Sequence, residues 1–153
     1  MSIEDRLKDL NIILPEAPKP VGAYAAYKKV GKLIFVSGQV SFRDDGVLIK
    51  GKIGSELTLE QGRIAAKACA INTLSQIKSA CDGDLEKIKN CIKITGFVNS
   101  VDSFIDQPKI INAASELLVE IFGEKGIHSR AAVSVNSLPL GASVEIESIF
   151  EIV

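Results

Sequence analysis

The chain has 153 residues, of which 46% are hydrophobic and 24% are charged, and its formal net charge at pH 7 is -1. A chain of this length and composition can bury a full hydrophobic core, so we expect one domain over residues 1–153 and exclude an intrinsically disordered chain. The nearly balanced charge gives no electrostatic footprint for nucleic acid, and we expect no nucleic-acid partner.

The first residues predict a short helical extension, over about residues 1–12, ahead of the main domain. Ile3, Leu7 and Leu10 recur at helical spacing. The segment carries acidic residues early and lacks the apolar core of about 7–15 residues that a secretory signal needs. No stretch approaches the ~20 apolar residues of a membrane-spanning helix. We therefore expect a cytoplasmic protein that does not associate with a membrane.

A β-hairpin is predicted next. A proline-rich lead-in, LPEAPKPVG at 14–22, precedes two strand-like stretches, AYAAYKKV at 23–30 and KLIFVSGQV at 32–40, with a tight Val-Gly-Lys turn between them. The glycine-containing polar residues 41–57 then indicate a loop or an irregular edge of the sheet.

A long helix is the clearest element of the sequence. Thr58 can cap its start, and Gln61 three residues later completes a capping-box pattern. The helix is expected to end near Ala80. Its apolar stripe contains Ile64, Ala65, Ala68, Cys69, Ile71, Leu74 and Ile77.

The rest of the chain predicts a strand, a helix and two further strands. KNCIKITGFVN at 89–99 is strand-like, and a second helix is expected from near Pro108 to Gly123. SRAAVSVN at 129–136 and SVEIESIFEIV at 143–153 follow as strands on either side of the turn SLPLG.

The order β-β-α-β-α-β-β predicts an α+β sandwich with both long helices on one face of the sheet. The other face would be left uncovered, while Ile34, Val36, Ile92 and Ile94 place apolar groups on the strands. An uncovered, partly apolar sheet favours self-association.

The cysteines and the histidine give no metal site. Cys69, Cys81 and Cys91 are odd in number and lack CxxC spacing, which indicates reduced thiols, with Cys69 and Cys91 in the core. The only histidine, His128, has no set of ligands around it. We expect neither a metal nor a cofactor.

Three charges interrupt the otherwise apolar final strands. Glu145 and Glu147 are two residues apart and share one strand face, opposite Val144 and Ile146. From the alternation alone this is a solvated face. By the same reasoning Arg130 is an ion-pair residue at the surface or at an interface.

Four blocks of the chain together resemble a known family. They are residues 23–40, 83–99, 104–123 and 129–152, and the last, with its R-x-x-V-x-V-x-x-L-P…VEIE pattern, is the most specific. In this order they resemble the Rid family, the YjgF-type reactive-intermediate deaminases. The resemblance implies a chorismate-mutase-like sandwich, of β-β-α-β-α-β-β order, that assembles as a homotrimer around a central barrel. It places the pockets between adjacent subunits.

The resemblance also implies an activity. Members with the arginine hydrolyse reactive 2-imino and enamino acids, such as 2-aminoacrylate, to 2-keto acids and ammonia without a cofactor. Arg130 matches the arginine that holds the substrate carboxylate, and Glu145 matches the glutamate that places the attacking water. Tyr24 matches a pocket tyrosine. The remaining positions that match pocket residues are Ser37, Gly38, Asn112 and Ala132. Of these, Asn112 matches only if FIDQPKIIN contains an insertion, and Ala132 stands where a cysteine is common.

Several features depart from the family pattern. His128-Ser129 replaces the usual Pro-Ala before the arginine, and the 41–57 loop and the N-terminal helix are longer, as in a separate branch. His128 is either a loop residue or an acid–base group at the mouth of the pocket. Tyr24 is either a pocket residue or a half-buried strand residue.

Two other functions are open at this point. One is a trimer that binds a small carboxylate without turnover, as a sensor or scaffold. The other is an endoribonuclease, which the net charge of -1 and an aromatic content of only 5% disfavour.

Overall fold

A computed structural model describes all residues, 1–153, and the order of long elements is the predicted β-β-α-β-α-β-β. The helices are α1 (Ile3–Asp9), α2 (Leu59–Ala80) and α3 (Gln107–Phe122), with short 3-10 turns at Leu85–Lys87, Gly123–Gly126 and Pro139–Gly141. The strands are β1 (Tyr27–Val30), β2 (Leu33–Val40), β3 (Ile88–Asn99), β4 (Ser129–Val135) and β5 (Val144–Ile152).

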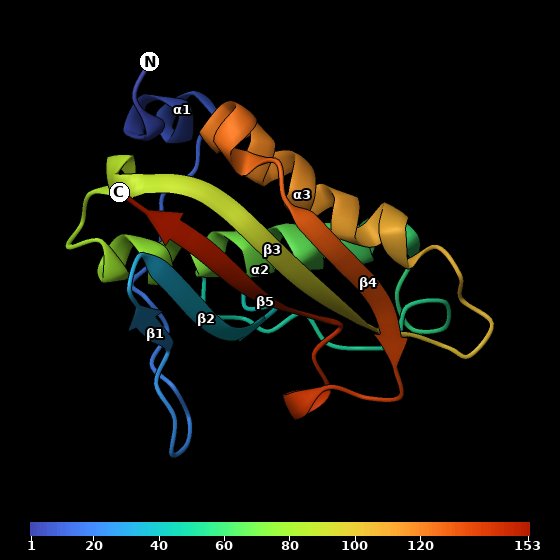
Figure 1. Ribbon diagram of the computed structural model, residues 1–153. Coiled ribbons are helices and arrows are strands. Elements are labelled where there is room, and N and C mark those ends of the chain that lie inside the picture. The colour runs from blue at the N-terminus through green and yellow to red at the C-terminus, as the bar shows by residue number, and fades with distance from the viewer.

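The five strands form one mixed sheet in the order β1-β2-β5-β3-β4. Only the β3–β4 pair is parallel. Both long helices cover the same face of the sheet, as the sequence predicted, and the opposite face is open (Figure 1). The last two strands of the chain are not neighbours, because β3 lies between them, and β4 is an edge strand.

Helix α2 begins with the capping box that the sequence predicted. The Thr58 side chain accepts from the backbone of Gln61, whose side chain accepts from the backbone of Thr58. The predicted stripe is wrong at Ile64, which is 59% exposed. Burial extends instead to the other flank of the helix, where Asn72 donates to the carbonyls of Val40 and Phe42. The segments that pack against this flank, rather than the apolar pattern of α2 itself, determine which side of the helix is buried.

The other predicted helices also form. Helix α3 carries Pro108 in its first turn and ends at Gly123, whose φ of 64° is accessible to glycine at little cost. The short helix α1 begins at a second capping box, formed by Ser2 and Asp5. Its Arg6 donates to the carbonyl of Ile121, so the N-terminal helix is fastened to the end of α3. None of the helices is both long and apolar enough to cross a membrane.

The first strand is shorter than the sequence predicted. The stretch from Ala23 was expected to be extended, but β1 begins only at Tyr27. The cause lies in the partner strand β2, whose register with β5 shifts between Val36 and Gln39. A bulge of this kind bends the strand and ends regular pairing, so residues 23–26 leave the sheet.

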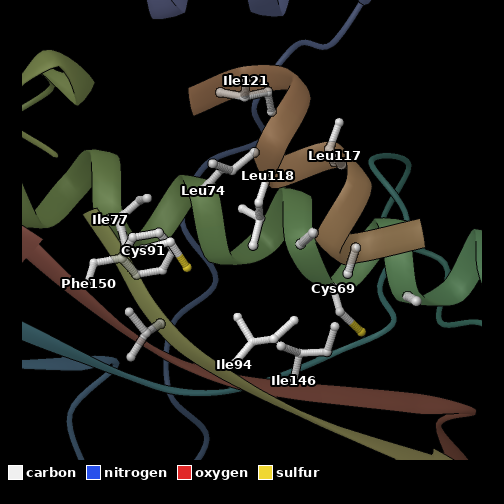
Figure 2. Close-up of a cluster of buried hydrophobic side chains, with 14 of the residues drawn as sticks. Cys69, Leu74, Ile77, Cys91, Ile94, Leu117, Leu118, Ile121, Ile146 and Phe150 are labelled. Atoms are coloured by element: carbon white, nitrogen blue, oxygen red, sulfur yellow. The ribbon is translucent and has the colours of Figure 1, made fainter. Parts of the chain in front are cut away.

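The hydrophobic core lies between the helices and the covered face of the sheet. Figure 2 shows Leu74 and Ile77 of α2 and Leu118 of α3 in one buried cluster with Ile94 and Phe150 of the sheet. All three cysteines are unpaired and buried, which confirms the prediction for Cys69 and Cys91.

The apolar residues of the strands divide between the two faces. Ile34, Val36 and Ile94 are buried under the helices. The open face instead carries Phe35 and Val133, whose exposed fractions are 42% and 45%. An apolar open face therefore exists, although different residues form it, and self-association stays a prediction.

Substitution of Gly126 is expected to destabilise the fold. A Cβ on this residue would lie 2.3 Å from the carbonyl oxygen of Leu118, a backbone atom that cannot rotate away. We expect Gly126→Ala to lower the free energy of unfolding by about 3 kcal/mol, as other overpacked sites do. At Gly22, in contrast, a Cβ would meet only the ring of Tyr24. Urea unfolding of both variants checks this, and equal stabilities would contradict it.

Candidate functional site

Four of the residues predicted from the family resemblance lie together. Tyr24, Ser37, Gly38 and Glu145 line one cavity of about 680 Å³, and we call this group the acidic half-site. Its residues come from the lead-in to β1, the bulge of β2 and the start of β5.

The β2 bulge shapes the acidic half-site. Ser37 and Gly38 occupy the register shift, and the Ser37 hydroxyl donates to the carbonyl of Ala25 over 2.6 Å. The Ser37 amide donates to the carbonyl of Ala26 over 2.9 Å. These two bonds hold the segment after Tyr24 against β2. The tyrosine itself remains 55% exposed at the cavity.

Gly38 leaves room for the carboxylate of Glu145. A Cβ on Gly38 would lie 2.5 Å from Oε2 of Glu145, closer than real carbon atoms approach. The absence of a side chain therefore lets the carboxylate pack directly over the backbone of the bulge.

The electrostatics of Glu145 are unusual for a strand carboxylate. Glu145 pairs with Val40 of β2 on one side and with Phe97 of β3 on the other, so it lies in the middle of the sheet. Burial raises the pKa of Glu145 above its ordinary value, and the charge of Glu147 raises it further. No protein group donates a hydrogen bond to the Glu145 carboxylate, so its oxygens are available to water or a ligand.

Buried amides line the deeper wall of the same cavity. Gln39, Asn72 and Gln76 are each nearly inaccessible. Gln76 donates to the carbonyl of Pro18 over 2.6 Å and lies 3.4 Å from Oε1 of Gln39. These contacts tie the proline-rich lead-in to α2 and form a polar wall.

The other predicted residues gather elsewhere. Nη1 of Arg130 donates to Oδ1 of Asn112 over 2.8 Å and to Oγ of Ser115 over 3.1 Å. Ala132 lies two positions further on the same face of β4, and His128 contacts Ser115 over 2.9 Å. We call these five residues the basic half-site.

The hydrogen bonds of Arg130 leave one edge of its guanidinium free. The two protons of Nη1 are used by Asn112 and Ser115. Nε and Nη2 have no protein acceptor. These two nitrogens form the side-on fork that binds a carboxylate bidentately.

The contacts of His128 disfavour its role as an acid–base group at a pocket mouth. Nδ1 lies 2.6 Å from the carbonyl oxygen of Gly126, and Nε2 contacts Ser115. Burial lowers the pKa of His128 below its ordinary value, and the charge of Arg130 lowers it further. A neutral ring with both nitrogens engaged has no free nitrogen for a substrate.

The two half-sites do not meet within one chain. Arg130 is in register with Ile94, which is buried under the helices, so the arginine lies on the covered side of the sheet. Glu145 is in register with Phe97 and alternates with the buried Val144 and Ile146, so it lies on the open side. Strand β3 also separates them.

A second cavity, of about 510 Å³, contains none of the predicted site residues. It lies on the outer side of α2, between residues 10–13 and the 41–57 loop, and its walls are mostly apolar. Ile64 and Ile71, which the sequence assigned to the core stripe, line it.

Ser115 is the residue that sequence reasoning missed in the basic half-site. It stands three positions after Asn112 in α3, and side chains at this spacing share one helix face. The Asn-x-x-Ser spacing was therefore a usable signal. Gln39, Asn72 and Gln76 gave no such signal, because their meeting depends on the bulge and the lead-in.

Fold and geometry together define an α+β sandwich with two separate candidate half-sites, one carboxylate-bearing and one arginine-bearing. The chain matches the family described as "YjgF/chorismate mutase-like, putative endoribonuclease" over residues 4–151. It therefore belongs to the YjgF family, as the resemblance to the Rid proteins predicted, and its fold is chorismate-mutase-like.

Individual relatives agree with this membership. Protein TCP17 of Trypanosoma cruzi is 42% identical over 147 residues, which cover 95% of this chain and 91% of the relative. The human 2-iminobutanoate/2-iminopropanoate deaminase is 27% identical over 136 residues, covering 88% and 83%. The crystal structure of Atu1372 from Agrobacterium tumefaciens, a protein of unknown function, superposes with a TM-score of 0.92 at 43% identity, covering 99% and 92%.

Proposed function

We propose that the protein hydrolyses reactive 2-imino acids, and their enamine tautomers such as 2-aminoacrylate, to 2-keto acids and ammonia. The observation that carries the proposal is the guanidinium of Arg130, whose Nη1 is saturated by protein while the Nε–Nη2 edge is free. A planar 2-imino carboxylate fits this edge bidentately, and the fork fixes both its position and its plane. The human relative named as an imine deaminase supports the substrate class.

The proposed chemistry needs a water molecule and a base. An enamine first takes a proton at C3 and becomes the protonated imine. Glu145 then orients water and accepts its proton as the oxygen adds to C2. Glu145 passes this proton to the nitrogen and then accepts the proton of the C2 hydroxyl as the C–N bond breaks. The 2-keto acid and ammonia leave, and Glu145 returns the proton to the departing ammonia. General acid–base help of this kind contributes roughly 10²–10⁴-fold in rate. A protonated imine is already electrophilic, so these steps need no further acid or base. Tyr24 either donates a hydrogen bond to the reacting molecule or forms part of the wall of the cavity.

The complete site is proposed to form between two copies of the chain. Arg130 and Glu145 lie on opposite faces of one sheet, so a single chain does not supply both to one substrate. Arg130 stands on the edge strand β4, and the open face beside Glu145 carries exposed Phe35 and Val133. A ring of three copies, with the open faces inward, satisfies both features, since head-to-tail contacts around a ring join one patch to a different one.

A coupled assay tests the proposed function. A serine dehydratase generates 2-aminoacrylate from serine, and pyruvate release is followed with and without the protein. We expect acceleration by the wild-type chain and none by Arg130→Ala. Equal acceleration by both chains would refute the proposal. A wild-type chain that binds pyruvate in calorimetry but does not accelerate its release would point instead to a carboxylate-binding sensor or scaffold.

Endoribonuclease activity appears in the family description, but the site offers it little support. The net charge of -1 supplies no general attraction for a polyanion. Cleavage of RNA that is lost in Arg130→Ala would favour this activity.

The pH dependence of turnover is expected to report on Glu145. The active form is the carboxylate, so kcat/KM rises with pH through the pKa of Glu145, which lies above its ordinary value. Glu147→Gln removes the neighbouring negative charge, so we expect the acidic limb to move to lower pH. The measurement is the pH profile of imine hydrolysis for both chains. A limb that stays in place would show that another group controls it.

A further inference from the structure

His128 and Ser115 have no part in the chemistry proposed above, yet they form an ordered chain of hydrogen bonds that ends on Arg130. The imidazole is partly buried between the end of α3 and the start of β4. Nδ1 lies 2.6 Å from the Gly126 oxygen, and Nε2 lies 2.9 Å from Oγ of Ser115. Ser115 in turn lies 3.1 Å from Nη1 of Arg130.

The direction of each bond follows from the chemistry of its ends. The carbonyl of Gly126 can only accept, so Nδ1 of His128 carries the proton and donates. A neutral imidazole then has an acceptor at Nε2, which receives the hydroxyl proton of Ser115. With its proton used, the Ser115 oxygen accepts from Arg130. Burial and the nearby guanidinium charge both lower the pKa of His128, which favours the neutral ring that this arrangement needs.

The end of this chain controls which edge of the guanidinium is free. Arg130 has five N–H donors, and two are taken by Ser115 and Asn112 at the same nitrogen, Nη1. If the Ser115 oxygen were not held, Nη1 would lose one partner and the guanidinium could rotate in its plane. Two fixed acceptors on one nitrogen hold the opposite edge, Nε and Nη2, toward the ligand.

We propose that His128, acting through Ser115, is a positioning residue that orients Arg130 to bind the carboxylate of the substrate. The proposal rests on the proposed function for the identity of the ligand. His128 and Ser129 stand where the family resemblance implies Pro-Ala. In this chain the substitution provides a second anchor for the arginine in addition to Asn112.

The experiment uses three alanine variants, the double variant Ser115→Ala/His128→Ala and one rescue variant of the full chain, with pyruvate as the probe. Ser115→Ala and His128→Ala each interrupt the series of hydrogen bonds from His128 through Ser115 to Arg130. His128→Gln returns an amide oxygen near the position of Nε2. Ser129→Ala is the matched control, because its hydroxyl donates to the carbonyl of Ile92 and not to this chain. Calorimetry gives the Kd for pyruvate, and the coupled assay gives kcat and KM.

We expect Ser115→Ala and His128→Ala each to raise Kd and KM by roughly 2- to 10-fold, the size of one net hydrogen bond, with kcat nearly unchanged. The double variant is expected to be no weaker than either single variant, because both break the same chain. His128→Gln should recover most of the affinity, and Ser129→Ala should bind like wild type. Unchanged affinity in both chain-breaking variants, or additive losses in the double variant, would overturn the proposal.

Nuclear magnetic resonance separates failure of this inference from failure of the proposed function. His128 is the only histidine, so its ring nitrogens give one set of signals. We expect the tautomer protonated at Nδ1. We also expect the Nε–H signal of Arg130 to move in Ser115→Ala and His128→Ala but not in Ser129→Ala. These signals do not depend on turnover. A proton at Nε2 of His128, or an Arg130 Nε–H signal that stays unchanged in Ser115→Ala and His128→Ala, would overturn the positioning role even in an active enzyme. An inactive wild type with the expected signals would refute only the deaminase.

Discussion

An assembly that contains both Arg130→Ala and Glu145→Gln chains is expected to regain activity that neither variant has alone. Each variant lacks one half-site but keeps the other intact. Where a Glu145→Gln chain offers its arginine to an Arg130→Ala chain, a complete site forms. In a head-to-tail ring of three that contains both chains, about one third of the interfaces carry both intact half-sites. We therefore expect about one third of wild-type turnover per chain in assemblies that contain both variants.

The physical reason is the geometry of the sheet. Arg130 faces α3 from the edge strand, whereas Glu145 lies on the open face two strands away. Neither side chain can cross the sheet, because the strands between them are hydrogen-bonded and the covered side is closely packed. If one chain supplied the whole site, mixing would restore nothing.

The measurement is pyruvate release by mixed assemblies, prepared by co-expression with two different tags and purified through both. A matched control mixes Glu145→Gln with the double variant Arg130→Ala/Glu145→Gln. No chain in that mixture carries Glu145, so it should stay inactive. Activity absent from the first mixture, although wild-type chains treated in the same way remain active, would refute the shared site.

Local patterns in the sequence were sufficient to predict nearly all of the secondary structure. The capping box at Thr58 and Gln61 and the glycine after α3 determine where helices begin or end through bonds within a few residues. The start of β1 was misplaced because it depends on a bulge in the partner strand. Ile64 was misassigned because its cover would have to come from segments distant in the sequence.

The candidate site, too, was predictable from local sequence patterns but not where it depends on tertiary packing. The sequence pattern identifies Arg130 and Glu145 as exceptions to strand alternation, and the family resemblance assigns their roles. Neither indicates that β3 comes between their strands, because the order of strands is set by tertiary packing. The bonds from Ser115 to Arg130 and to His128 likewise join an α3 side chain to residues around the start of β4. Of these, only the spacing from Asn112 to Ser115 is visible in the chain itself.

A methyl group at Gly38 is expected to abolish most of the activity while leaving the fold intact. The added Cβ of Gly38→Ala would lie 2.5 Å from Oε2 and 2.9 Å from Cδ of Glu145. These atoms belong to the far end of a flexible side chain, so the carboxylate moves and the backbone of the bulge does not. In the proposed mechanism a displaced Glu145 no longer places water, so we expect kcat to fall by roughly 10²-fold, as for the loss of a general base.

The double variant Gly38→Ala/Glu145→Ala tests whether the added methyl group acts by displacing the carboxylate of Glu145. If the methyl group acts only by displacing the carboxylate, then Gly38→Ala has no further effect on kcat or stability once Glu145 is an alanine. Gly31→Ala is the matched control, since its Cβ would meet nothing within 4 Å but its φ is +57°. That strain in the hairpin turn should lower the free energy of unfolding by about 1 kcal/mol and leave kcat unchanged. It thereby separates lost stability from lost placement of water. Full activity in Gly38→Ala would mean that Glu145 can serve from another position, and the close packing of Gly38 against its carboxylate would then be structural only.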